Sequence, residues 1–148
     1  MRTPRRRARE FALQAMYQYW ANPGQSVTTL MDNIKSTDTF VLAVTDKKPR
    51  VDEVFFDQLL KGCYIEEKNY ESILSPHLDR PWSEVSWVEK AALVLAAYEL
   101  SHFQETPAAV IINEAVELVK IYGKNESYRF INGVLDQLLF HVRPNEAR

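Results

Sequence analysis

Several residue types that build catalytic or metal sites are scarce in this chain of 148 residues. Its one cysteine, Cys63, cannot form an internal disulfide or a cysteine-rich zinc site, and its apolar neighbours predict a buried thiol. The three histidines, His77, His102 and His141, do not stand at the spacings of metal-binding motifs. With four glycines, the chain contains no glycine-rich phosphate loop. We therefore expect no enzyme, no metal and no cofactor.

Long hydrophobic runs are also missing. No stretch of about 18 apolar residues occurs, so we expect no membrane-spanning helix. The segment Met1–Arg5 leads into charge, where a secretory signal would lead into an apolar stretch. The length and the hydrophobic content of 46% suit one compact domain. The expected location is the cytoplasm.

Charge is distributed unevenly along the chain. Residues 1–9 contain five arginines and no acid, so they carry +5; because the whole chain carries −2, the remainder carries −7. A mildly acidic body with one strongly basic end is typical of a protein that binds an anion through that end. The acidic remainder can contact a basic protein.

Helix-favouring residues fill the intervals between clear breaks, which predicts an all-α fold. The stretch 37–50 fits a helical turn, a short strand or a loop. Ser86 and Glu89 have the spacing of a capping box, and Thr106 stands as a cap before Pro107. Val54 is among the residues expected to face the core. The expected helices cover about 4–21, 26–35, 52–75, 86–100, 107–122 and 126–142.

The arginines of the basic end carry a planar guanidinium that matches pairs of phosphate oxygens. At about 100° per residue, Arg5 and Arg9 share one face of the first helix, whereas Arg7 points outward. Positive charge at a helix N-terminus opposes the helix dipole, and an anionic partner relieves that cost. The pattern alone leaves two interpretations open, a nucleic-acid-binding surface or a solvated charged end.

Aromatic residues add a second feature, because bases of single-stranded RNA stack on exposed rings. Tyr17 and Tyr122 lie at a helix edge and a helix end, and they are the stacking candidates that the pattern favours. The helical spacing of Phe130 assigns that residue to the core.

Three stretches together resemble the NusB family of bacterial transcription antitermination factors. They are Arg5-Arg6-Arg7-Ala8-Arg9-Glu10 with residues 12–17, Val88-Glu89-Lys90 with residues 97–100, and residues 112–118 continuing into 122–123 and 127–136. The resemblance covers nearly the whole chain, although residues 28–50 match weakly. It implies one NusB-like domain of two perpendicular helical bundles, an N-terminal bundle of about residues 1–80 and a C-terminal bundle of about residues 81–148.

The resemblance also implies a function and partners. Proteins of this family bind the boxA element of nascent ribosomal RNA together with NusE, a small-subunit ribosomal protein, and help RNA polymerase and other Nus factors to pass terminators. Glu84 and Glu89 are expected to face NusE. The family's RNA surface overrules the core assignment of Phe130. It maps onto Arg5, Arg6, Arg7, Arg9, Gln14, Tyr17, Tyr122, Lys124 and Phe130.

Glu126 lies next to the expected RNA surface, so its charge is predicted to weaken RNA binding. Two alternatives stay open. One is an RNA-binding front end of a ribosomal RNA methyltransferase, and the other is a helical adaptor that binds protein alone. Whether the chain forms a homodimer in its unbound state is also open.

Overall fold

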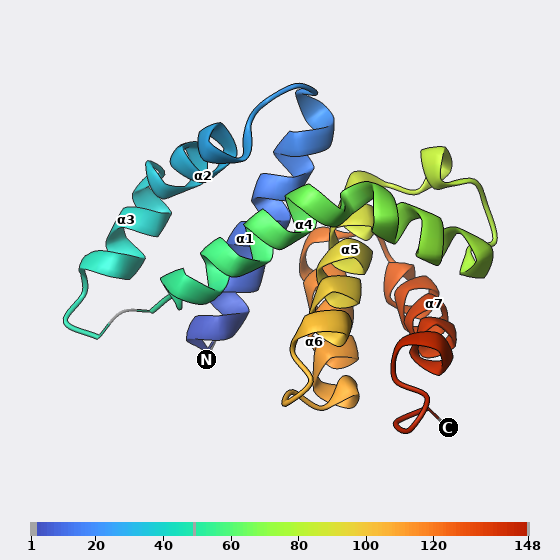
Figure 1. Ribbon diagram of the computed structural model, residues 1–148. Helices are drawn as coiled ribbons and strands as arrows, with labels where there is room; N and C mark the ends of the chain where they lie inside the picture. The colour runs from blue at the N-terminus through green and yellow to red at the C-terminus, as the bar shows by residue number, and fades with distance from the viewer. Residues whose placement is uncertain (1–2, 49, 148) are drawn as a thin grey trace. The chain divides into compact units, whose positions relative to one another are not determined.

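The computed structural model describes residues 3–48 and 50–147. All the regular structure of these residues is helical, as predicted for the fold class (Figure 1). Two short 3₁₀ helices, η1 (Ser75–His77) and η2 (Trp82–Glu84), join longer helices. The α-helices are α1 (Pro4–Ala21), α2 (Val27–Lys35), α3 (Asp38–Thr45), α4 (Glu53–Leu74), α5 (Trp87–His102), α6 (Ala108–Tyr122) and α7 (Ser127–Val142).

The chain divides into two compact units inside α4, between Tyr64 and Ile65. Unit 1 is Met1–Tyr64 and unit 2 is Ile65–Arg148. The boundary between two bundles near residue 80, which the family resemblance implies, stays a prediction. The two compact units divide within an unbroken helix, and the first turns of α4 pack with α1 and α3. The perpendicular packing of two bundles stays a prediction.

Three phenylalanines hold the core of unit 1 together. The ring of Phe40 in α3 lies 4.9 Å from that of Phe11 in α1 and 5.5 Å from that of Phe56 in α4. The Thr37 side chain accepts a hydrogen bond from the amide of Phe40 and begins α3. The stretch 37–50, which the sequence left open, therefore contributes a helix and a core anchor.

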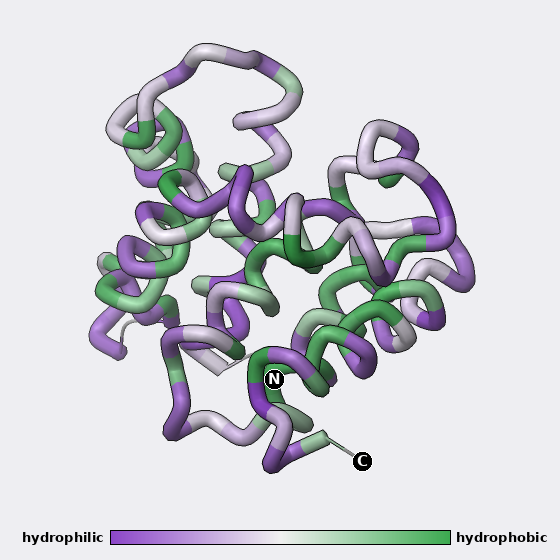
Figure 2. The backbone as a smooth tube through the Cα atoms, turned by 45° about the vertical axis from the view of Figure 1, so that its right-hand side comes forward, coloured by the Kyte–Doolittle hydropathy of each residue, from purple (hydrophilic) through white to green (hydrophobic). Residues whose placement is uncertain are grey.

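The central element of unit 2 is α5. Eleven of its 16 residues are buried, and both α6 and α7 contact it. The predicted capping box is confirmed: the amide of Glu89 donates to Ser86 Oγ, and Glu89 Oε1 accepts from the amide of Ser86. Figure 2 shows green hydrophobic and purple hydrophilic residues alternating along the helices. An all-round apolar helix is what a buried core position requires.

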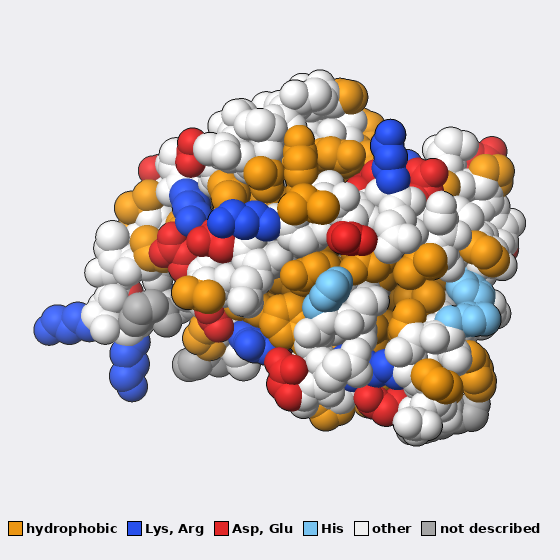
Figure 3. All heavy atoms as spheres, viewed as in Figure 1, with side chains coloured by type: hydrophobic (Ala, Val, Ile, Leu, Met, Phe, Trp, Pro, Cys, Tyr) orange, Lys and Arg blue, Asp and Glu red, His pale blue; other side chains and the backbone are white. Residues whose placement is uncertain are grey.

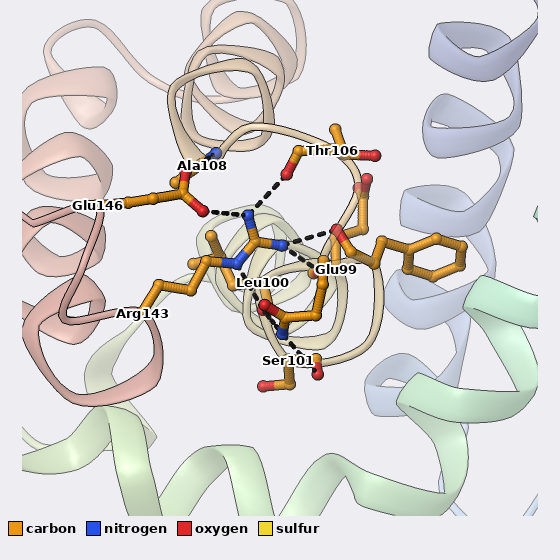
Figure 4. Close-up of polar contacts among 9 residues, drawn as sticks. Glu99, Leu100, Ser101, Thr106, Ala108, Arg143 and Glu146 are labelled. Carbon is orange, nitrogen blue, oxygen red and sulfur yellow. Dashed lines mark hydrogen bonds and ion pairs between the residues drawn. The ribbon is translucent and has the colours of Figure 1, made fainter.

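A buried arginine joins the end of α7 to the end of α5 (Figure 4). Arg143 is 4% exposed. Its guanidinium donates to the carbonyl oxygens of Leu100 at 2.9 Å, Phe103 at 2.7 Å and Thr106 at 2.6 Å. Carbonyls at a helix C-terminus lack partners within the helix. Leu100 also accepts from the Gln104 side chain and Phe103 from the Thr106 amide, and Arg143 adds a charge-assisted hydrogen bond to each.

The expected cap at Thr106 is wrong. Pro107 occupies the cap position and has no side-chain hydrogen bond to the helix. The amide of Ala108 donates instead to Glu146 Oε2 at 2.7 Å, and Glu146 Oε1 accepts from Arg143 at 3.0 Å. A carboxylate 38 residues away thus caps α6, and local spacing carries no signal of it.

The expected burial of Val54 is also wrong, because 69% of this residue is exposed. Phe55 and Phe56 are both buried, and in a helix with only one buried face the position before them is turned away from that face at 100° per residue. The predicted burial of Cys63 is confirmed. Among residues 3–48 and 50–147, no helix is long and apolar enough to cross a membrane.

Candidate nucleic-acid interface

The arginine-rich start of α1 begins at a well-formed cap. Thr3 Oγ1 accepts from the amide of Arg6 at 3.1 Å, and Pro4 takes the first helical position. No acidic residue lies in the first turn of the helix. The charge that balances these arginines must therefore come from elsewhere in unit 1.

The first turn of α4 supplies part of that balance. The Arg5 guanidinium carbon lies 4.3 Å from the centre of the Phe55 ring, and Arg5 Nε lies 3.7 Å from Asp52 Oδ2. Asp52 is fixed in turn, because its amide donates to the carbonyl of Pro4 and its carboxylate accepts from the amide of Phe55. The side chain of Arg5 remains 43% exposed, so part of this cation faces solvent.

The remaining arginines of α1 differ in exposure. Arg9 also lies over the Phe55 ring, at 5.1 Å, which confirms the expected shared face with Arg5. However, Arg9 is only 4% exposed. Arg7 does not point freely outward as expected: its side chain is 22% exposed, pairs with Glu10 at 3.2 Å and lies over Phe11 at 5.0 Å. Arg6 is half-buried.

Two further candidates lie along the same helix. Tyr17 is 41% exposed, as a stacking residue requires. Gln14 is half-buried. At helical spacing Gln14 and Tyr17 stand one turn apart, so both fall on one side of α1.

In unit 2, the candidates gather around the turn between α6 and α7. Tyr122 ends α6 and is 37% exposed. Gly123 follows because a Cβ there would lie 2.7 Å from the carbonyl oxygen of Val119. Lys124 is exposed. Glu126 adopts the left-handed conformation, with φ 72°, directly before α7.

Phe130 lies in the first turn of α7 and is half-buried, which fits neither a core residue nor a fully exposed platform. The Arg80 guanidinium carbon lies 4.3 Å from the centre of its ring. Sequence reasoning missed Arg80, because it stands in the irregular segment between η1 and η2, where helical periodicity gives no information.

Tyr128 forms a second aromatic–cation group that the sequence analysis missed. Lys120 Nζ lies 5.2 Å from the centre of its ring and the Arg129 guanidinium carbon 5.7 Å. Arg129 also lies 3.9 Å from a Glu126 oxygen. The adjacency of Tyr128, Arg129 and Phe130 was the available signal. Figure 3 shows basic side chains lying beside acidic ones on the face that it displays.

The two acids assigned to a protein partner differ. Glu84 lies in η2 and is exposed. Glu89 is 7% exposed, and its Oε1 accepts from both the amide and the hydroxyl of Ser86. Glu89 therefore acts mainly as a helix cap, and Glu84 presents the more accessible carboxylate.

Together these features define a helical protein with exposed cations next to aromatic rings. Among the described residues, no group of three or more metal-ligating side chains occurs. The NusB family model matches residues 6–140. The chain belongs to the NusB family.

Relatives and solved structures agree with this assignment. The chain is 44% identical, over 99% of its length and 83% of the relative's, to the transcription antitermination protein NusB of Laribacter hongkongensis. The corresponding protein of Ralstonia pickettii is 43% identical over 99% of this chain and 88% of its own. The structure of T. maritima NusB has a TM-score of 0.77 at 29% identity, covering 93% of this chain and 92% of its own.

A further solved structure contains NusB and NusE in complex with double-stranded RNA. Its TM-score is 0.74 at 22% identity, with 90% of this chain and 93% of that chain covered. This likeness concerns the fold.

Proposed function

We propose that this chain is a transcription antitermination factor that binds the boxA element of nascent ribosomal RNA together with NusE. The observation that carries the proposal is the arginine-rich start of α1, where the Arg5 side chain is 43% exposed and lies 3.7 Å from Asp52. Family membership and the names of relatives more than 40% identical over nearly the whole chain support it. Binding, with no catalytic step, is the proposed activity, and the cytoplasm is the proposed location.

In this proposal, the arginines of α1 contact phosphates and the aromatic residues contact bases. Arg5, Arg6 and Arg7 supply charge from unit 1, with Gln14 and Tyr17 further along α1. Arg9 is a positioning residue, because its buried guanidinium on Phe55 fixes the helix face beside Arg5. Tyr122, Lys124 and Phe130 are the proposed contacts from unit 2.

NusE and the elongating RNA polymerase, with other Nus factors, are the proposed protein partners. The −7 charge of the chain beyond residue 9 supports contact with a basic ribosomal protein. Glu84 is the proposed NusE-facing acid, since most of the Glu89 carboxylate is enclosed by its own helix cap. A homodimer of the chain without RNA is an alternative that measurement of its mass in solution would decide.

The test is binding of a boxA RNA oligonucleotide to the purified chain, with and without NusE, followed by filter retention. We expect a complex that forms with boxA, weakens with a scrambled oligonucleotide of equal length, and tightens with NusE. Equal retention of both oligonucleotides in the presence of NusE contradicts the proposal.

A further inference from the structure

Arg80 and Phe130 form a stacked pair at the surface of unit 2. The guanidinium carbon of Arg80 lies 4.3 Å from the ring centre, and Phe130 is half-buried in the first turn of α7. The Arg80 side chain is 36% exposed. One side of the guanidinium thus rests on an aromatic ring, while part of the group remains accessible.

Asp79 fixes the orientation of this guanidinium. Arg80 Nε donates to Asp79 Oδ1 at 2.7 Å, and Nη2 donates to Oδ2 at 3.3 Å. Two parallel hydrogen bonds hold the planar guanidinium of arginine in one orientation. A lysine ammonium has no such plane to fix. The hydrogen bond from Arg80 also lowers the pKa of the Asp79 carboxyl, so the ion pair persists at neutral pH.

The same pairing offsets the positive charge that Arg80 could offer to a phosphate. Glu84 and Glu89 add negative potential at Arg80. A neutralised guanidinium releases few counterions from a polyanion and contributes little to salt-dependent affinity. Its flat face keeps its ability to stack, and bases of single-stranded RNA stack on arginine planes as well as on aromatic rings.

We propose that Arg80 is an RNA-contacting residue that extends Phe130 into a stacking platform, on whose guanidinium one unpaired RNA base lies. The inference rests on the proposed RNA binding and adds to it a base-contacting residue in an irregular segment. Asp79 is the positioning residue of this platform.

The experiment measures the affinity of a single-stranded boxA oligonucleotide, over a range of salt concentrations, for three variants. Arg80→Ala removes the plane and the charge, whereas Arg80→Lys keeps only the charge. Arg50→Ala is the matched control, because Arg50 also pairs with an aspartate, Asp46, at 3.0 Å, with 74% of its side chain exposed. Thermal unfolding checks that each variant is folded.

We expect Arg80→Ala and Arg80→Lys to weaken binding about equally, by about fivefold to tenfold, with an unchanged slope of log K against log salt. Arg50→Ala should stay within about twofold of the original chain. If Arg80→Lys restores binding, or if the salt slope falls, Arg80 contacts phosphate and the stacking proposal is wrong. If Arg80→Ala binds the RNA as tightly as Arg50→Ala does, Arg80 has a purely structural role and the proposal is wrong.

A second measurement locates the base. An oligonucleotide series with one abasic position at a time should contain a position whose loss weakens binding to the original chain but not to Arg80→Ala. A series in which every abasic position affects both proteins equally overturns the proposal. If the original chain does not bind boxA RNA at all, the proposed function fails. If the original chain binds boxA RNA and the Arg80 variants bind it as tightly as Arg50→Ala does, only the platform proposal fails.

Discussion

Each unit of this chain contains an arginine at 4.3 Å from a phenylalanine ring, but the two arginines differ in their acidic partner. Arg5 in unit 1 approaches Asp52 only to 3.7 Å. Arg80 in unit 2 is hydrogen-bonded to Asp79 at 2.7 Å. The hydrogen-bonded carboxylate offsets the charge of Arg80 more closely, which suits Arg80 to contacting a base and the run of arginines in α1 to positioning the RNA.

The two units also hold their candidate residues by different means. In unit 1, Lys35 Nζ lies 2.9 Å from both Glu53 and Asp57, so a partly exposed ion-pair group joins α2 to α4. In unit 2, the buried Arg143 joins the end of α7 to the end of α5. Buried groups cost more to disrupt than exposed ones, so the framework of unit 2 should respond more strongly to mutation.

Arg143→Ala tests this difference with the largest expected effect. The substitution removes charge-assisted hydrogen bonds to the carbonyls of Leu100, Phe103 and Thr106, each worth about 1.5–3 kcal/mol. The first two carbonyls keep a second, uncharged donor. We expect the free energy of unfolding to fall by about 3 kcal/mol or more, measured by urea denaturation. A loss below about 1 kcal/mol would contradict the structural role given to this arginine.

Glu146→Gln provides the pH control for the same group. The hydrogen bond from the amide of Ala108, and then the contact with Arg143, hold the pKa of Glu146 below its ordinary value of 4.5. A carboxyl with a lowered pKa in the folded state stabilises the fold above pH 4.5, and the stabilisation is lost as the pH falls through the folded pKa. Stability of the original chain should therefore decline below pH 4.5 more steeply than that of Glu146→Gln.

These long-range contacts mark the limit of prediction from sequence. The helix α1 was predicted at its observed bounds because a cap, a proline and a closing Asn-Pro-Gly are local signals. The cap on Ala108 was missed because its carboxylate is remote in sequence. The helix α3 was left open because its short apolar run suits several structures, and packing of Phe40 between two other rings decides it.

The candidate site was predicted in part for a related reason. The arginines of α1 form a run that composition alone reveals, but their exposure depends on Phe55 and Asp52, which lie far along the chain. Family resemblance moved Phe130 from the core to the surface, and the half-buried ring lies between these expectations. Arg80 was missed because only the folded segment brings it to that ring.

The double substitution Arg6→Ala with Arg7→Ala sharpens the contrast between phosphate and base contacts. If each arginine makes one charge-assisted contact of about 1.5 kcal/mol, boxA affinity should fall about hundredfold. The slope of log K against log salt should also become shallower by about 0.7 to 1 for each lost contact. An unchanged slope would show that these arginines do not meet phosphate, in contrast to the constant slope expected for the Arg80 variants.

Lys35→Met measures how much the partly exposed ion-pair group of unit 1 stabilises the fold, for comparison with the buried Arg143 of unit 2. Burial alone would lower the pKa of the Lys35 ammonium, but the hydrogen bonds that it donates to Asp57 and Glu53 outweigh burial and raise the pKa. Solvent screens this partly exposed group, so we expect a loss of only about 1 kcal/mol in the free energy of unfolding, decreasing further in high salt. A loss as large as that of Arg143→Ala would remove the distinction between the two units.

Glu126→Gln is expected to have the smallest effect, and it should strengthen RNA binding rather than weaken it. The Glu126 side chain is 69% exposed and lies 3.9 Å from Arg129, so its charge both repels an approaching phosphate and holds a cation away from it. Glutamine keeps the size and meets the same left-handed backbone, so folding should be unchanged. We expect boxA RNA to bind about twofold to threefold more tightly, or about 0.5 kcal/mol.

The matched control for this last substitution is Glu105→Gln, which removes one exposed acid from the turn between α5 and α6. A change in net charge alone would tighten binding equally in both variants, whereas a local effect would appear only in Glu126→Gln. Because screening weakens repulsion between exposed charges, the gain should shrink as salt rises. If Glu126→Gln binds the RNA no more tightly than the original chain does, RNA does not approach the α6–α7 turn. The arginines of α1 would then be the main candidate contact.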